Sequence, residues 1–147
     1  NRKAFFRYTV KEGETPESVA LKFYGSAKMS WLVHFSNLHM DPYHDWPMSY
    51  LEFIRYLKQK YGSVPAAKAN IEYYEHPDYT FNINVPTYER YSNADFIDST
   101  LSVDRTGWTA VESYTREVQE NDDKRNIDLL HPDFVYIVER ELEEIYS

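Results

Sequence analysis

The chain has 147 residues, a formal net charge of −8, no cysteine and an aromatic content of 17%. The lack of cysteine excludes disulfides, thiol catalysis and cysteine-based zinc sites. The negative charge repels nucleic acid, and no apolar run approaches the roughly 18 residues that a membrane span needs, so we expect neither partner. Because Tyr and Trp combine a large apolar ring with one polar group, this many aromatic residues suits protein interfaces as well as cores.

A short strand followed by a capped helix is predicted for residues 5–25. Residues 5–10 are rich in aromatic and β-branched side chains, as strands are. Thr15 is placed to cap a helix, Pro16 suits its first position, and Gly25 supplies a left-handed stop. The apolar residues between them share one helical face: Val19, Ala20, Phe23 and Tyr24.

A second helix and a loop come next. Ser26 is placed to cap this helix, which should end near Asn37 and turn three residues inward: Trp31, Leu32 and Phe35. Residues 38–48 contain two prolines and therefore form a loop.

The third helix has the clearest signature in the chain. Ser49 and Glu52 form a capping box at its start, and Gly62 ends it. Its apolar stripe is expected to be Tyr50, Phe53, Ile54, Leu57 and Tyr61. Residues 63–70 contain Pro65 and three alanines, and we interpret them as a linker or a frayed extension of the helix.

A β-hairpin and an extended arm are predicted for the middle of the chain. Residues 71–75 form one expected strand, residues 76–78 a turn, and residues 79–85 a second strand in which apolar and polar side chains alternate until Pro86. Residues 87–107 have no convincing periodicity, so we expect a disordered stretch or an arm laid on a partner.

The C-terminal part is expected to be a strand, a polar stretch and a helix. Residues 108–114 form the possible strand, and residues 116–130 are mostly polar. Asp133 is placed to cap the final helix, whose acidic side faces solvent. Its other face carries Phe134, Ile137, Val138, Leu142 and Ile145.

Residues 8–37 resemble a LysM module. Such modules commonly open with Y-T-V-x-x-G-D/E-T and a helix containing S-I/V-A, and residues 8–20 here are YTVKEGETPESVA. In place of the usual short closing strand, the chain continues into a D-P-x-x-D-W-P-x-S loop at residues 41–49 and then the long third helix.

The longer pattern is similar to the baseplate wedge protein 53 family of T4-type phages. That family shares the T-P-E-S-V-A helix, an aromatic second helix and the D-P-x-x-D-W-P-x-S loop. It also carries N-x-x-K-R-x-I-x-L-L-x-P-x-Y/F-V, which matches residues 121–135. The resemblance covers both ends of the chain and leaves residues 86–107 unmatched.

The resemblance implies a structural role in the virion. It implies a subunit of a contractile phage tail baseplate wedge, made in the host cytoplasm as a late protein and present in several copies around the tail axis. It further implies a hetero-oligomeric assembly with other wedge and inner-baseplate proteins, in which the LysM-like part docks proteins. On this basis we expect no enzymatic activity.

The main alternative is a LysM module that binds peptidoglycan or chitin. The N-acetylglucosamine groove would lie between the loops at residues 13–15 and 38–46, where Tyr43 and Trp46 could stack on a sugar. We favour protein docking, because a fold does not carry its function with it.

Metal binding and catalysis have weaker support. His34, His39 and His44 lie near Asp41 and Asp45, but a five-residue spacing does not place imidazoles on one helical face. We therefore expect no metal site and no cofactor. The C-terminal carboxylates form an exposed run, and no G-x-S-x-G elbow is present, so a tail-associated hydrolase is only a distant alternative.

The predicted fold class is α+β with two parts. Residues 1–62 should form a small LysM-like module with an added long helix and its own core: Tyr8, Val10, Val19, Phe23, Leu32, Phe35, Ile54 and Leu57. Residues 63–147 should supply the hairpin, the extended arm and the C-terminal helix, lack a complete core, and be ordered by subunit contacts. Within the second part, residues 121–125 are either a solvated polar helix or a segment that docks on an acidic partner.

The predicted partner-binding residues are Trp31, Tyr43, Trp46, Lys124, Arg125, Leu129, Leu130 and Phe134.

Overall fold

A computed structural model describes residues 4–39, 41–92 and 107–147 of the chain. The predicted α+β class is confirmed, because helices occur together with two small antiparallel sheets. The chain groups into two compact units. The terminal unit comprises residues 1–53 and 121–147, and the middle unit comprises residues 54–120.

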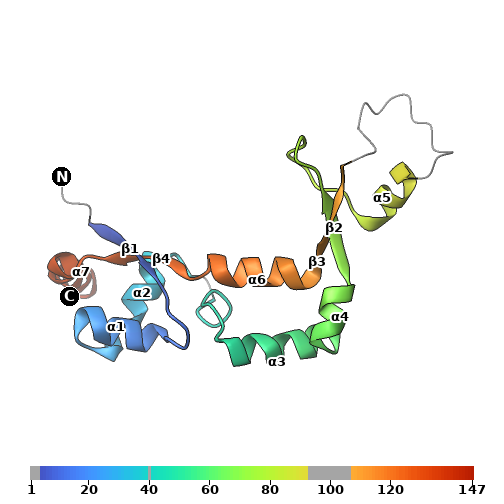
Figure 1. Cartoon of the computed structure of the whole chain (residues 1–147). Coiled ribbons are helices and arrows are strands. Elements are labelled where there is room, and N and C mark those ends of the chain that lie inside the picture. Colours follow the sequence, from blue (N-terminus) through green and yellow to red (C-terminus); the bar gives the residue numbers. More distant parts are fainter. Residues whose placement is uncertain (1–3, 40, 93–106) are drawn as a thin grey trace. The chain divides into compact units, whose positions relative to one another are not determined.

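The terminal unit is built around one pair of strands from opposite ends of the sequence. Strand β1 (Phe5–Thr9) pairs antiparallel with β4 (Asn126–Leu130), with Phe5 opposite Leu130 and Thr9 opposite Asn126. Helices α1 (Pro16–Tyr24) and α2 (Ser30–Ser36) follow β1 and are joined by a short 3-10 turn, Ala27–Met29. Figure 1 shows β1 and β4 side by side with α1 and α2 next to them.

The start and end of α1 confirm the sequence prediction. The Thr15 hydroxyl accepts the Ser18 backbone N–H, the Ser18 hydroxyl accepts the Thr15 N–H at 2.8 Å, and Pro16 occupies the first helical turn. Gly25 ends the helix at φ 76°, a conformation that favours glycine. Its N–H donates to the Leu21 carbonyl at 3.1 Å, so the end of the helix is closed as well as its start.

The core of the terminal unit draws on both of its chain segments. Its buried members are Val10, Val19, Ala20, Val33, Trp46, Ile127 and Leu129. Tyr8 and Phe23 pack against this cluster, as predicted. The prediction that residues 1–62 have a core of their own is wrong, because Ile127 and Leu129 of β4 fill its centre.

Helix α2 turns a different face inward from the one predicted. Leu32 is buried as expected, but its buried neighbour is Val33, while Trp31 and Phe35 are exposed. The 3-10 turn before α2 sets its rotation, and the compact Val33 side chain fits into the core.

Helix α3 (Tyr50–Tyr61) has the predicted capping box. The Ser49 N–H donates to Glu52 Oε2 at 3.3 Å, and the Glu52 N–H donates to Ser49 Oγ at 3.4 Å. Phe53 and Leu57 are buried, whereas Tyr50 is exposed, so the expected apolar stripe is correct in its middle and wrong at its start.

The middle unit contains a separate helix where a linker or a frayed extension of the preceding helix was expected. Helix α4 (Val64–Ala69) begins at Ser63, whose hydroxyl accepts the Ala66 N–H at 3.1 Å. Pro65 lies in the first turn, where its missing N–H has no helical partner to lose. Neither predicted alternative is correct, because residues 64–69 form a helix with its own cap, which is neither a linker nor a frayed end of α3. The proline favours the start of this helix instead of breaking one.

The predicted hairpin is corrected by the structure. Strand β2 (Ile71–Glu75) forms as expected but pairs antiparallel with β3 (Thr109–Glu112), not with residues 79–85. Of residues 79–85, only Ile83 forms a bridge with β2, through two backbone hydrogen bonds to Tyr74 of 2.7 and 3.0 Å. Tyr74, Ile83 and Trp108 form a small buried cluster.

The predicted arm is helical at its start. Pro86 lies in the first turn of helix α5 (Val85–Ser92), where it starts a helix instead of only stopping a strand. The rest of the expected arm, residues 93–106, lies outside the described residues.

The C-terminal part also differs from the expectation of one polar stretch. Helix α6 (Ser113–Asp123) leads into β4, and a 3-10 turn (Pro132–Phe134) precedes helix α7 (Val135–Tyr146). The cap at this point is the His131 ring, which accepts the Asp133 N–H at 3.2 Å, so Asp133 is not the cap. No helix in the described ranges is both long and apolar enough to cross a membrane.

Candidate interaction surface

An exposed apolar stripe on α2 is the first candidate surface. Trp31 is 40% exposed, Phe35 67% and Leu38, just after the helix, 80%. Trp31 and Phe35, at i and i+4, share one face of the helix, and Leu38 follows just after its end, in a left-handed conformation at φ 53°. The opposite face, with Leu32 and Val33, supplies the core, so α2 is apolar on both sides. We call Trp31, Phe35 and Leu38 the α2 stripe.

The loop after α2 is held by one carboxylate. Asp41 accepts the backbone N–H groups of Tyr43 at 3.0 Å and of His44 at 3.3 Å, and its carboxylate also pairs with the His44 ring. The Asp41 N–H in turn donates to the Asp45 carboxylate at 3.0 Å. This turn presents Tyr43 to solvent, since its side chain is exposed.

Trp46 lies inside the terminal unit. It belongs to the buried core cluster, and its indole Nε1–H donates to the Glu14 carbonyl at 2.9 Å. This bond joins the two loops that would form the walls of a LysM sugar groove. A ring with its face in the core cannot stack on a sugar, so Trp46 has a structural position here.

Two histidines, His34 and His39, pack beside Trp46. Their Nδ1 atoms lie 2.9 Å apart, so one ring donates a hydrogen bond and the other accepts it. Both rings also contact the indole edge-on. Burial lowers the pKa of His34 and His39, and the nearby His34 lowers the pKa of His39 further. No group of metal-ligating side chains is found among the residues that the structure describes.

The histidine pair predicts an acid-sensitive loop. Because the folded pKa values lie below the unfolded value of about 6.5, the neutral pair adds stability above that pH and loses it below. Acidification from about pH 7.5 to about pH 5 should lower Tm by roughly 2 °C and shift the NMR signal of the Trp46 indole N–H.

The same titration has a matched control. His39→Gln should remove most of the Trp46 shift, whereas His44→Gln, at an exposed ring three residues from Asp41, should leave it intact. An unchanged Trp46 signal in the wild-type chain would contradict the role of the pair.

The two predicted basic docking residues bind the protein's own loops. Lys124 Nζ donates to the His44 carbonyl at 2.7 Å. Arg125 donates to the Met48 carbonyl at 3.1 Å and pairs with the Glu12 carboxylate at 3.2 Å. Both cations therefore connect the segment before β4 to the N-terminal part of the terminal unit.

The predicted apolar anchors are divided between core and surface. Leu129 and Leu130 are buried in the unit itself, and the Leu130 carbonyl accepts the Tyr24 hydroxyl at 2.7 Å. Phe134 is half-buried beside the His131 ring. Of the eight predicted partner-binding residues, the structure leaves Trp31 and Tyr43 most open. It also exposes Phe35 and Leu38, which sequence periodicity alone did not select.

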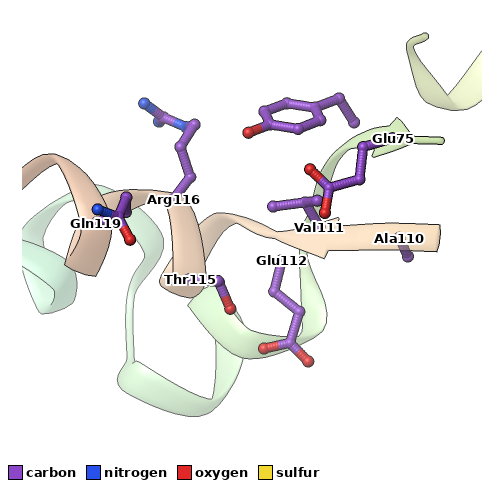
Figure 2. Close-up of a pocket in the computed structure, with 8 residues that line it drawn as sticks. Glu75, Ala110, Val111, Glu112, Thr115, Arg116 and Gln119 are labelled. Carbon is purple, nitrogen blue, oxygen red and sulfur yellow. The ribbon is translucent and has the colours of Figure 1, made fainter. Parts of the chain in front are cut away.

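A polar pocket lies on the middle unit (Figure 2). It is lined by Tyr73, Glu75, Ala110, Val111, Glu112, Thr115, Arg116 and Gln119. Its cation is already neutralised, because Arg116 contacts the carboxylates of Glu72 at 3.2 Å and Glu120 at 2.6 Å. The pocket therefore offers no free positive charge to an anionic ligand.

A buried carboxylate lies behind this arginine. Glu117 is buried and accepts from Lys60 at 2.7 Å, from Tyr61 at 3.0 Å and from Arg116 at 2.9 Å. Burial opposes its ionisation, but the hydrogen bonds from Lys60 and Tyr61 more than offset that cost, so the pKa of Glu117 lies below its usual value. These three hydrogen bonds all come from internal donors and end on the same oxygen, Oε1, as expected for a structural ion network.

Comparison with protein-family models gives a match over most of the chain. The family model described as "Base plate wedge protein 53" matches residues 3–138, which is most of the chain and includes both strands of the terminal unit. No curated protein matches the chain.

Proposed function

The chain belongs to the base plate wedge protein 53 family, and from this we propose that it joins neighbouring wedge proteins around the tail tube of a contractile phage tail. The family assigns it a structural role in a phage baseplate, in the virion tail. A structural subunit of this kind acts by binding and needs no catalytic group. Its partners are other wedge and inner-baseplate proteins, in a hetero-oligomeric assembly with several copies around the tail axis.

The observation that carries this proposal is the α2 stripe. Three large apolar side chains on and just after a short helix are costly to leave in water, at about 25 cal/mol per Å² of apolar surface. Exposed apolar patches of this kind mark protein–protein contacts, and Trp is enriched at their centres. We assign the α2 stripe, together with Tyr43 of the loop that follows α2, to a contact with another wedge protein.

The order of elements supports a LysM-like module used for docking. Strand β1, helices α1 and α2 and strand β4 form a β-α-α-β arrangement with one antiparallel strand pair. The second strand comes from the far end of the chain instead of following α2. The buried Trp46 argues against the N-acetylglucosamine-binding alternative, because its ring packs in the core and not in an open groove.

Complementation tests the proposal. A phage with a disabled gene for this subunit should form plaques when the wild-type chain is supplied, and electron microscopy should show complete baseplates that contain it. Phe35→Asp should lower plaque yield by about a hundredfold, since charge at a desolvated contact is poorly tolerated. Leu21→Asp is the matched control, because Leu21 is similarly exposed on α1, outside the stripe.

Two results would overturn the proposal at different levels. Baseplates that assemble normally without the chain would remove the structural role. Equal plaque yields for Phe35→Asp and Leu21→Asp, with both proteins folded, would remove the α2 stripe from the contact.

A further inference from the structure

Helix α7 carries an apolar stripe that its own chain does not bury. Val138, Leu142 and Ile145 follow the i, i+4, i+7 spacing of one helical face. The first two are half-buried, Ile145 is 72% exposed, and no residue of α7 is buried. The helix is therefore amphipathic but has its apolar face only partly covered.

The edges of this stripe are acidic. Glu139 and Glu141 lie on its two sides, and neither side chain makes a hydrogen bond or ion pair with a described residue. The one cation of the helix, Arg140, pairs with Glu144 at 3.6 Å. A surface that is apolar with free carboxylates at its margins selects a partner that is apolar with free cations.

The solvent face of α3 has that complementary character. Leu51 is 72% exposed, and Arg55 and Lys58 follow it at i+4 and i+7 on the same helical face. Both cations are exposed, and their side chains make no hydrogen bond or ion pair within the described parts of the chain. The other side of the helix, with Phe53 and Leu57, is buried.

We propose that α7 of one copy docks on the solvent face of α3 of the next copy. Leu142 and Ile145 pack on Leu51, while Glu139 and Glu141 pair with Arg55 and Lys58. The α2 stripe fits α7 less well, because it offers apolar contact without two free cations at this spacing. The inference rests on the proposed function, since a baseplate holds neighbouring copies close together.

The two surfaces differ, so the contact is heterologous. Such contacts repeat from one copy to the next and close into a ring when the rotation allows. Each helix has 12 residues and is therefore about 18 Å long. Two helices of this length bury less surface area against each other than a standard stable interface does. The contact is therefore weak between free copies and strengthened by the high local concentration in an assembly.

Carboxyl–amine cross-linking of the wild-type chain tests the contact. Phage is grown with a mixture of ¹⁴N- and ¹⁵N-labelled chain, and intact baseplates are treated with a carbodiimide, which couples Glu to Lys directly. We expect mixed-label cross-links between Lys58 and Glu139 or Glu141 in mass spectra. Only a link between copies can carry both labels. The same treatment of the free chain at millimolar concentration should give the link in a concentration-dependent yield.

Charge exchange supplies the control. The double variants E139K/E141K and R55E/K58E each remove one of the two reacting groups, so neither variant alone should give a mixed-label link between residue 58 and residue 139 or 141. A mixture of these two variants should restore it. Gln59→Glu adds a carboxylate on the same helix but keeps Arg55 and Lys58, so it should leave the yield of the wild-type link unchanged.

The outcomes separate this contact from the proposed function. Baseplates that contain the chain and form other links, but no mixed-label link between α3 and α7, would overturn the contact and leave the function standing. Failure of the charge-exchanged mixture to restore the link would overturn it as well. A chain missing from baseplates would remove the function, and the free-chain experiment would then decide the contact.

Discussion

A chain that ends at Arg125 is expected to lose the fold of the terminal unit, although it keeps all of residues 4–53. Strand β4 is the only described strand that pairs with β1, and its Ile127 and Leu129 lie in the centre of the core. Loss of each buried aliphatic side chain costs about 3 kcal/mol. Their combined loss, together with the strand pair, is comparable with the whole stability of a small domain.

The truncation is read out by near-ultraviolet circular dichroism and by the dispersion of NMR amide signals from residues 4–53. A chain that ends at Phe134 is the matched control, because it keeps β4 and removes α7, which has no buried residue. Leu129→Ala should be intermediate, with a loss of about 3 kcal/mol in the free energy of unfolding. Native dispersion in the shorter truncation would show that residues 4–53 fold without β4.

Glu117→Gln is expected to be the most damaging single polar substitution in the middle unit, at about 3 kcal/mol. The carboxylate is buried and accepts from three donors, two of them cations. An amide cannot balance Lys60 and Arg116, and its N–H₂ group would face donors instead of acceptors. Urea unfolding followed by circular dichroism measures the loss.

The pH dependence of this variant provides an internal check. The lowered pKa of Glu117 means that its contribution is present above the unfolded value of about 4.3 and is lost as the pH falls through the folded value. The wild-type chain should therefore lose stability in acid more steeply than Glu117→Gln. Glu120→Gln, at an exposed carboxylate that also contacts Arg116, should cost about 0.5 kcal/mol. Equal losses for the two variants would contradict the role of the buried network.

Helix boundaries could be predicted from the sequence because their causes are local. Thr15 and Ser49 cap helices through groups three residues away, and Gly25 closes α1 on its own last turn. The structural role of proline was ambiguous, because its missing N–H can end a strand or a helix and also suits the first turn of a new helix. Pro65 and Pro86 both start helices that the sequence did not predict.

The strand partners could not be predicted, because pairing depends on residues far apart in the chain. Residues 79–85 alternate as a strand should, yet β2 takes most of its pairs from residues 109–112. Residues 126–130 also alternate, with Ile127 and Leu129 on one face, but they follow a long polar stretch that hid the pattern. Periodicity gives the face of a strand and says nothing about its neighbour.

The surface was only partly predictable for the same reason. Trp31 and Trp46 are the same type of residue, but the first lies on the exposed side of α2 and the second lies in the core. Which aromatic ring remains in solvent depends on how α2 is rotated by the turn before it, and on β4 reaching the core from the other end of the chain. Neither is visible in a local window of sequence.

Because β1 pairs with β4, the terminal unit can complete its fold only late in synthesis, after the residues of the middle unit have been made. The ribosome makes β1, α1 and α2 first, but they must wait through all of residues 54–120 for the strand that closes them, while the middle unit has its full set of residues earlier. Nascent chains therefore expose an open sheet edge and an unfilled apolar face until residues 126–130 have been made. Under the proposed contact through the α2 stripe, an interrupted chain would lack a properly formed docking surface and would be left out of a growing virion.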